Sequence, residues 1–191
     1  KTLAPLYVSL FLNTAPFMIY FGEEVGEKGM DEEGFSGRDG RTTIFDWWSV
    51  ASIRRLRKLI ASGKYRSASV SELVENGLMK EEAELFLRFT EAIRFAAEDC
   101  SIRQGTTYDL CYCNMSSDGF DKNRHFVFLR DYEEHTLLIA ANFSNREAVM
   151  KLVIPEHAFE WMGIPKTEAL HPGKVIEVKV QPMDGAIVTL I

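Results

Sequence analysis

A hydrophobic run, APFMIYFGEEVG at residues 15–26, decides the fold. It opens at Pro16, shows no polar alternation and is closed by Gly22. Such a run is typical of a β-strand that is buried on both faces, as in a parallel sheet covered by helices. Two glutamates and a second glycine follow at once, and polar residues directly after a buried strand are typical of the ligand-binding mouth of a barrel. We therefore predict a buried strand over residues 16–21.

A second motif, RDGRTTIFDWW, follows at residues 38–48. The hydrophobic run, the acidic pair, the arginine-containing loop and the tryptophans together closely resemble the eighth strand and following loop of the alpha-amylase superfamily, glycoside hydrolase family 13. Two positions depart from the family's pattern, because Ala15 stands where the family usually has glycine and Thr43 where it frequently has proline. The resemblance spans the whole chain, is strongest over residues 15–48 and is only architectural after residue 105.

The resemblance implies an α+β chain that is part of a larger enzyme. Residues 1–104 would form the last strand and the helices of a (β/α)8 barrel, and residues 105–191 an antiparallel β-sandwich. A complete barrel takes about 250 residues, so the earlier strands would lie upstream of Lys1. The resemblance also implies retaining hydrolysis or transfer at an α-glucosidic bond of an α-glucan or maltooligosaccharide.

Retaining chemistry needs a carboxylate nucleophile and a carboxylic acid as proton donor. In the family both follow earlier strands, so we expect no catalytic residue in this chain and no activity of the chain alone. The alternative pair is Glu23 with Glu24. Adjacent residues that leave a strand point to opposite faces, which makes this alternative unfavourable.

Four residues are candidates for contacts with sugar hydroxyls: Glu23, Arg38, Asp39 and Arg41. Guanidinium groups and carboxylates suit bidentate hydrogen bonding to hydroxyls. The alternative is an arginine–carboxylate network that only holds the loop in shape, and both roles stay open. Arg38 and Asp39 are the better ligand candidates, and Glu24 is the better structural one.

The acidic run Asp31, Glu32 and Glu33 suggests either calcium binding or a solvated surface. We favour the solvated surface because the run lacks EF-hand spacing. We therefore expect no metal site and no cofactor in this chain, although the resemblance allows calcium in the parent enzyme.

Three tryptophans, Trp47, Trp48 and Trp161, are candidates for stacking on sugar rings. Packing in the core is the favoured alternative, because Trp47 and Trp48 open an amphipathic helix. The cysteines, Cys100, Cys111 and Cys113, are too few and too irregularly spaced for a disulfide framework or a zinc site. We expect them to be small buried side chains, with Cys111 and Cys113 on one face of a strand.

The chain has 191 residues, of which 46% are hydrophobic and 26% are charged, as is typical of a globular protein. Its 28 acidic and 22 basic residues give a formal charge of −6, which argues against a nucleic-acid-binding surface and suits a neutral ligand such as a sugar. No run approaches the roughly 18 to 20 hydrophobic residues of a membrane helix. We therefore expect neither a nucleic acid nor a membrane as a partner.

The start of the chain carries no basic segment before a signal-like hydrophobic core. The hydrophobic pattern of a helix is already under way at Lys1, so we expect the true N-terminus to lie elsewhere. Members of the family are often secreted or periplasmic, and the compartment of this chain stays open.

Hydrophobic periodicity predicts helices over residues 2–14, 47–60 and 79–102, with Asp46 as a cap of the second helix. A helical turn is also predicted near residues 155–162. From Thr106 onward the hydrophobic period changes from 3.6 to 2, and short runs separated by turn residues predict an antiparallel sandwich. The predicted strands are Thr106–Asn114, His125–Asp131, Thr136–Phe143, Ala148–Ile154, Lys174–Gln181 and Ala186–Ile191.

Two other functions remain open beside the enzyme fragment. One is a non-catalytic carbohydrate-binding or assembly module, in which the sandwich and its aromatic residues form the ligand surface. The other is self-association, because an orphan barrel strand exposes unpaired backbone groups along both edges.

Overall fold

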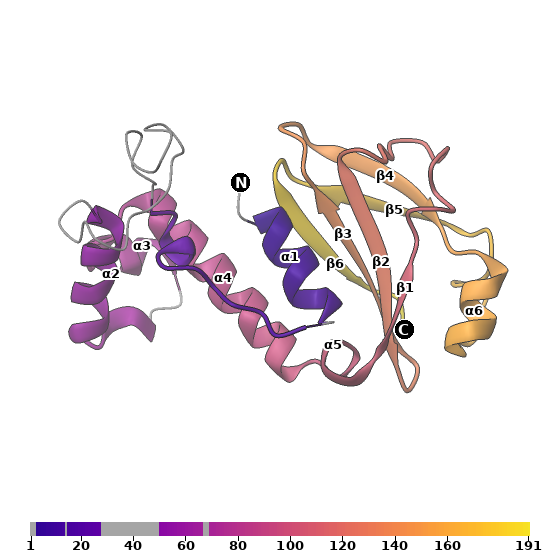
Figure 1. Cartoon of the computed structure of the whole chain (residues 1–191), viewed down its shortest axis with the longest axis horizontal. Coiled ribbons are helices and arrows are strands. Elements are labelled where there is room, and N and C mark those ends of the chain that lie inside the picture. The colour runs from indigo at the N-terminus through magenta and orange to yellow at the C-terminus, as the bar shows by residue number, and fades with distance from the viewer. Residues whose placement is uncertain (1–2, 14, 28–49, 67–68) are drawn as a thin grey trace. The chain divides into compact units, whose positions relative to one another are not determined.

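The computed structural model describes residues 3–13, 15–27, 50–66 and 69–191, and its elements are labelled in Figure 1. The chain divides into two compact units, one made of Lys1–Phe17 with Ala92–Ile191 and the other of Met18–Glu91. The class is mixed α and β, and every pair of neighbouring strands is antiparallel.

The predicted strand over residues 16–21 is wrong for this structure. Residues 16–20 have no strand hydrogen bonds, and a turn begins at Phe21. A strand exists only beside a partner that satisfies its backbone groups, and the six strands of the described residues pair only with one another. The described residues therefore do not show the end of a (β/α)8 barrel.

The unit that spans residues 18–91 is helical. Val25 and buried side chains of the helices and their connections form its hydrophobic core. Its elements are η1 (Glu23–Val25), α2 (Ala51–Ala61), η2 (Lys64–Arg66), α3 (Val70–Glu75) and most of α4 (Lys80–Glu98). The predicted cap Asp46 and the tryptophans Trp47 and Trp48 lie outside the described residues.

The long predicted helix over residues 79–102 is two helices, α4 and α5 (Cys100–Gln104). The break is at Asp99, whose backbone is extended and whose Oδ1 accepts the N–H of Ile102 at 3.0 Å. Asp is a strong helix N-cap, so it starts a new helix where the hydrophobic period alone continues. Its other oxygen, Oδ2, lies 2.9 Å from Nε2 of His135 and ties α5 to the sheet.

The second half of the chain is the predicted antiparallel sandwich. One sheet has four strands in the order β1-β2-β3-β6, and the other pairs β4 with β5. In the central pair Phe128 of β2 lies opposite Ile139 of β3. The strands are β1 (Thr106–Asp109), β2 (His125–Tyr132), β3 (His135–Asn142), β4 (Ala148–Val153), β5 (Val175–Val180) and β6 (Asp184–Thr189), and the predicted helical turn is α6 (Glu156–Met162).

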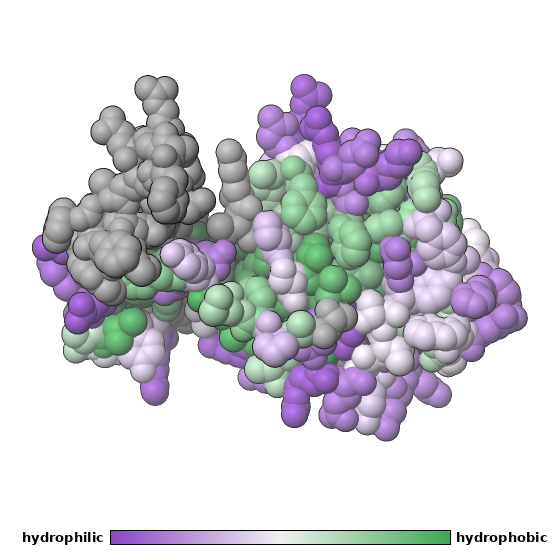
Figure 2. Space-filling view, viewed as in Figure 1, coloured by the Kyte–Doolittle hydropathy of each residue, from purple (hydrophilic) through white to green (hydrophobic). Residues whose placement is uncertain are grey.

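Strand β3 is buried on both faces, which explains its uninterrupted hydrophobic sequence. Leu138 and Ala140 belong to the core between the two sheets, together with side chains of β4 and β5. Leu137 and Ile139 point to the opposite face, where α1 (Leu3–Leu12) lies against β3 and β6 (Figure 1). Hydrophilic side chains gather along the outer edges of this unit on the face shown in Figure 2.

The first strand of the sandwich ends at Asp109, earlier than predicted, and turns occupy the residues up to Asn114. Asn114 is fully buried, and its side chain makes the backbone turn after this strand. Its Nδ2 donates to the carbonyl oxygen of Leu110 at 2.9 Å and to that of Val153 at 3.0 Å, and its Oδ1 accepts the N–H of Val153 at 2.9 Å. The side chain thus replaces a strand partner and fixes a turn. Cys111 and Cys113 therefore lie in this turn segment and not on one strand face, and both are half-buried.

Candidate functional site

Of the four predicted sugar contacts, only Glu23 belongs to the described residues, and Arg38, Asp39 and Arg41 lie outside them. Glu23 opens the 3-10 helix η1, and its Oε2 accepts the backbone N–H of Tyr20 at 2.8 Å. This carboxylate therefore closes its own turn. The described residues leave the predicted sugar site untested.

The turn that contains Glu23 is sterically fixed. Gly22 has a φ of 84°, and a Cβ at this position would lie 2.6 Å from Cβ of Glu27 and 2.8 Å from Cδ1 of Ile53. Val25 is buried behind the turn. Sequence analysis did not identify Glu27, whose Oε2 accepts the N–H of Ile53 at 2.9 Å and so caps the first turn of α2. Position 22 is therefore restricted to glycine by its positive φ and by the contacts with Glu27 and Ile53.

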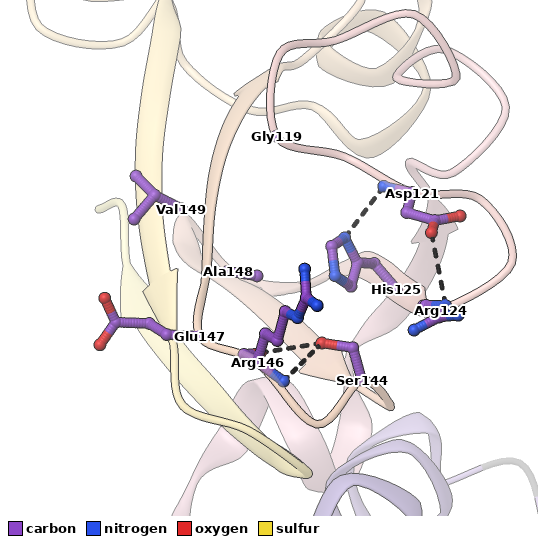
Figure 3. Close-up of a pocket in the computed structure, with 9 residues that line it drawn as sticks. All are labelled: Gly119, Asp121, Arg124, His125, Ser144, Arg146, Glu147, Ala148 and Val149. Carbon is purple, nitrogen blue, oxygen red and sulfur yellow. Dashed lines mark hydrogen bonds and ion pairs between the residues drawn. The ribbon is translucent and has the colours of Figure 1, made fainter.

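A pocket of about 340 Å³ lies at one end of the sandwich, between the loop before β2 and the loop that joins β3 to β4 (Figure 3). Its floor includes His125, whose Nδ1 accepts the backbone N–H of Asp121 at 3.0 Å. Burial lowers the pKa of His125, and Arg124 lowers it further, while Asp121 and Asn142 act in the opposite direction. His125 is therefore a neutral structural residue at neutral pH.

Most polar atoms of this pocket are already used to hold its loops. Ser144 Oγ donates to the carbonyl oxygen of Arg146 at 2.8 Å, and the carboxylate of Glu147 points away from the pocket toward Lys179, 3.0 Å away. The guanidinium of Arg146 points toward His125 in Figure 3 and makes no hydrogen bond with the described residues. The described side chains of this pocket therefore mainly hold its two loops together.

A group of aromatic side chains lies at the junction of β1 and α6. We call Tyr108, Tyr112, His157 and Trp161 the aromatic cluster. Tyr108 is buried at its centre, with ring centroids 6.2 Å from Tyr112, 5.9 Å from His157 and 5.9 Å from Trp161. Tyr112 is 51% exposed and Trp161 is 56% exposed. Trp161 is therefore on the surface, contrary to the favoured alternative of core packing.

Hydroxyl groups join the aromatic cluster into one network. The hydroxyl oxygens of Tyr108 and Tyr112 lie 2.5 Å apart, and Nδ1 of His157 lies 3.1 Å from the hydroxyl of Tyr108. Burial and the hydrogen bond with Tyr112 raise the pKa of Tyr108. The hydroxyl of Tyr108 is therefore protonated at neutral pH and can donate a hydrogen bond. Sequence analysis did not single out His157, which stands one helical turn before Trp161.

The described part of the chain contains no group of three or more His, Cys, Asp or Glu residues that could hold a metal ion. The acidic run Asp31, Glu32 and Glu33, for which a solvated surface is favoured over calcium binding, lies outside that part. None of its helices is long and hydrophobic enough to cross a membrane.

Burial raises the pKa of Cys111 to about 11, so this thiol is not a reactive nucleophile at neutral pH.

The chain matches no protein-family model and no curated protein. It does match solved structures of glycoside hydrolase family 13 enzymes, the family that its sequence resembles. The isomaltulose synthase SmuA from Protaminobacter rubrum is 12% identical, with a TM-score of 0.49, over 97% of this chain and 37% of its own. Cyclic alpha-maltosyl-(1-->6)-maltose hydrolase from Arthrobacter globiformis is 14% identical, with a TM-score of 0.42, over 96% of this chain and 29% of its own.

A third match is an isomaltulose synthase mutant from Erwinia rhapontici NX5, solved in complex with sucrose. It is 14% identical, with a TM-score of 0.47, over 97% of this chain and 37% of its own. The chain thus spans about a third of the length of the structures it matches.

Proposed function

We propose that this chain is the C-terminal part of an alpha-amylase-like glycoside hydrolase that acts on α-glucans or maltooligosaccharides with a retaining mechanism. The nucleophile and the proton donor would come from residues outside this sequence. The proposal rests on the two motifs at residues 15–26 and 38–48 and on the antiparallel sandwich that follows them.

One structural observation carries the proposal. The segment that most closely resembles the family exposes its hydrophobic side chains, since Met18 is 81% exposed and Tyr20 is 48% exposed. Residues 16–20 of this segment form no strand hydrogen bonds with the described residues. A hydrophobic extended segment is normally covered on its faces and paired along its edges. In the proposed enzyme the preceding strands of a barrel would supply both.

The fixed turn after this segment fits the same proposal. A strand that ends in a rigid turn can hold the loop behind it in a constant position relative to a substrate. Glu23, Arg38, Asp39 and Arg41 would then lie at the mouth of the barrel, where their carboxylate and guanidinium groups could bind sugar hydroxyls.

The test is expression of the coding sequence extended upstream of Lys1, with assays of reducing sugar released from starch and maltooligosaccharides. We expect turnover by the extended protein and none by the 191-residue chain. Within the extended protein, Asp39→Asn should raise KM, and Glu33→Gln in the same loop is the matched control. The proposal is wrong if the 191-residue chain itself shows turnover that Glu23→Gln abolishes, or if the extended protein is inactive on every α-glucoside.

A second candidate function is a non-catalytic carbohydrate-binding or assembly module. The exposed rings of the aromatic cluster favour it, because large aromatic side chains on a surface commonly mark a binding site. An inactive extended protein together with glucan binding by the 191-residue chain would establish this second function in place of the first.

A further inference from the structure

We propose that the aromatic cluster is a binding site for a neutral α-linked glucan chain, with Trp161 and Tyr112 as the two stacking residues. The choice of an α-glucan rests on the proposed function, whereas the presence of a site rests on the cluster itself.

The first argument is exposure. Trp161 and Tyr112 leave more than half of their surface in contact with water although both adjoin the buried ring of Tyr108. Keeping aromatic surface in water costs roughly 25 cal/mol per Å² relative to covering it. A ligand that covers the exposed parts of the two rings would recover this free energy.

The second argument is rigidity. Trp161 is carried by α6, which is anchored by the fully buried residues Ala158 and Phe159. Tyr112 is held through its hydroxyl by Tyr108, which is also bonded to His157 of α6. The helix that carries Trp161 and the hydroxyl of Tyr112 are therefore held in place before any ligand arrives, and preorganised groups lose little conformational entropy on binding.

The third argument is the chemistry of the cluster. Its ring faces are apolar, while its edges carry two phenol hydroxyls and an imidazole. Nδ1 of His157 is bonded to Tyr108, and its other ring nitrogen has no hydrogen-bond partner among the described residues. A pyranose ring has the complementary pattern, with apolar C–H faces and hydroxyls around its rim.

Charge narrows the class of ligand. Asp109 follows Tyr108 in the sequence and Glu160 precedes Trp161, and both carboxylates are exposed. The charge of Asp109 also acts on Tyr108. Two carboxylates disfavour phosphate, sulfate and nucleic acid. A neutral sugar chain meets no such repulsion, and its repeated rings can contact Trp161 and Tyr112 together where a monosaccharide contacts one.

The test is calorimetric titration of the 191-residue chain with maltose and maltohexaose. We expect tighter binding of maltohexaose, and an increase of at least tenfold in its Kd for Trp161→Ala and for Tyr112→Ala. Trp161→Phe should retain most of the affinity. Phe143→Ala, which removes an aromatic residue of the same sandwich that is 40% exposed, is the matched control and should leave Kd unchanged. Thermal unfolding of each variant checks that the fold is intact.

Several outcomes would overturn the proposal. One is that maltohexaose does not bind, and another is that Trp161→Ala and Phe143→Ala weaken its binding equally. A third is that cellohexaose binds with equal affinity. The last is that the chain binds the cation tetramethylammonium, which aromatic rings also attract, in place of the sugar. Failure here leaves turnover by the upstream-extended protein untouched, so it is distinguishable from failure of the proposed function.

Discussion

Arg130 of β2 donates a hydrogen bond from Nη1 to the carbonyl oxygen of Leu12, the last residue of α1, across 3.0 Å and 118 residues of sequence. The same guanidinium donates from Nε to the carbonyl oxygen of Ser101 at 2.9 Å and from Nη2 to that of Ile102 at 2.7 Å. Carbonyl groups at helix C-termini lack partners within the helix and carry partial negative charge. One buried arginine therefore joins α1 and α5 to the sheet.

Replacing Arg130 with Met should destabilise the sandwich unit by about 2 kcal/mol, because it removes the charged donor to the carbonyl oxygens of Leu12, Ser101 and Ile102. The last two keep one donor each, from Gly105 and Asn13. Urea unfolding followed by tryptophan fluorescence measures the change. Arg103→Met on the exposed side of α5 is the control and should change the free energy of unfolding by less than about 0.5 kcal/mol. Equal effects of the two substitutions would contradict the role of Arg130.

The pair formed by Arg55 and Glu82 makes the helical unit sensitive to acid. Glu82 is nearly buried, which would raise its pKa, but hydrogen bonds from Arg55, Ser52 and the N–H of Met79 outweigh burial and lower the pKa to about 2. A lowered folded-state pKa contributes stability that is complete above the ordinary pKa near 4.5 and is lost as the pH falls through 4.5 toward 2.

Glu82→Gln should therefore destabilise the helical unit by about 2 kcal/mol at pH 7 and by progressively less below pH 4.5. Urea unfolding of both proteins between pH 3 and pH 7 measures this difference. The control is Glu84→Gln, which removes an exposed pair with Lys80 and should have little effect at any pH. A constant difference between wild type and Glu82→Gln across the pH range would show that the pKa of Glu82 is not lowered.

The sandwich could be predicted from the sequence because its signals are local. Short hydrophobic runs separated by turn residues define the six strands, and five of the predicted strands agree closely with the structure. The first strand ends early because the side chain of Asn114 bonds to Val153, 39 residues away, and no local pattern reports such a contact.

The segment at residues 16–21 shows the opposite case. Its hydrophobicity specifies that it should be covered, but a strand also needs a neighbour, which the described residues do not provide. Trp161 was a stacking candidate from the sequence, but the aromatic cluster around it was missed for a similar reason. Tyr108 and His157 are 49 residues apart, and their contact depends on how α6 packs beside β1.

Gly22→Ala should destabilise the helical unit more than Gly63→Ala does. Both glycines have positive φ, at 84° and 72°, so both substitutions strain the backbone by roughly 1 kcal/mol. At Gly22 the new Cβ also collides with Glu27 and Ile53, whereas Gly63 has nothing within 4 Å. We expect an additional loss of about 1–3 kcal/mol for Gly22→Ala, measured as the difference between the two variants in urea. Equal losses would show that the turn adapts to a side chain.

Met18 is the most exposed large hydrophobic side chain of the described residues, and it stands in a segment whose backbone has no strand partner. Such a segment favours pairing with a second copy of the chain. We expect the 191-residue chain to self-associate as its concentration rises, and Met18→Asp to shift it toward the monomer, as measured by sedimentation velocity. Ile60→Asp, at a side chain of α2 that is 49% exposed, is the control and should leave self-association unchanged. A wild-type chain that stays monomeric at every concentration, or equal effects of the two substitutions, would exclude this segment as the contact surface.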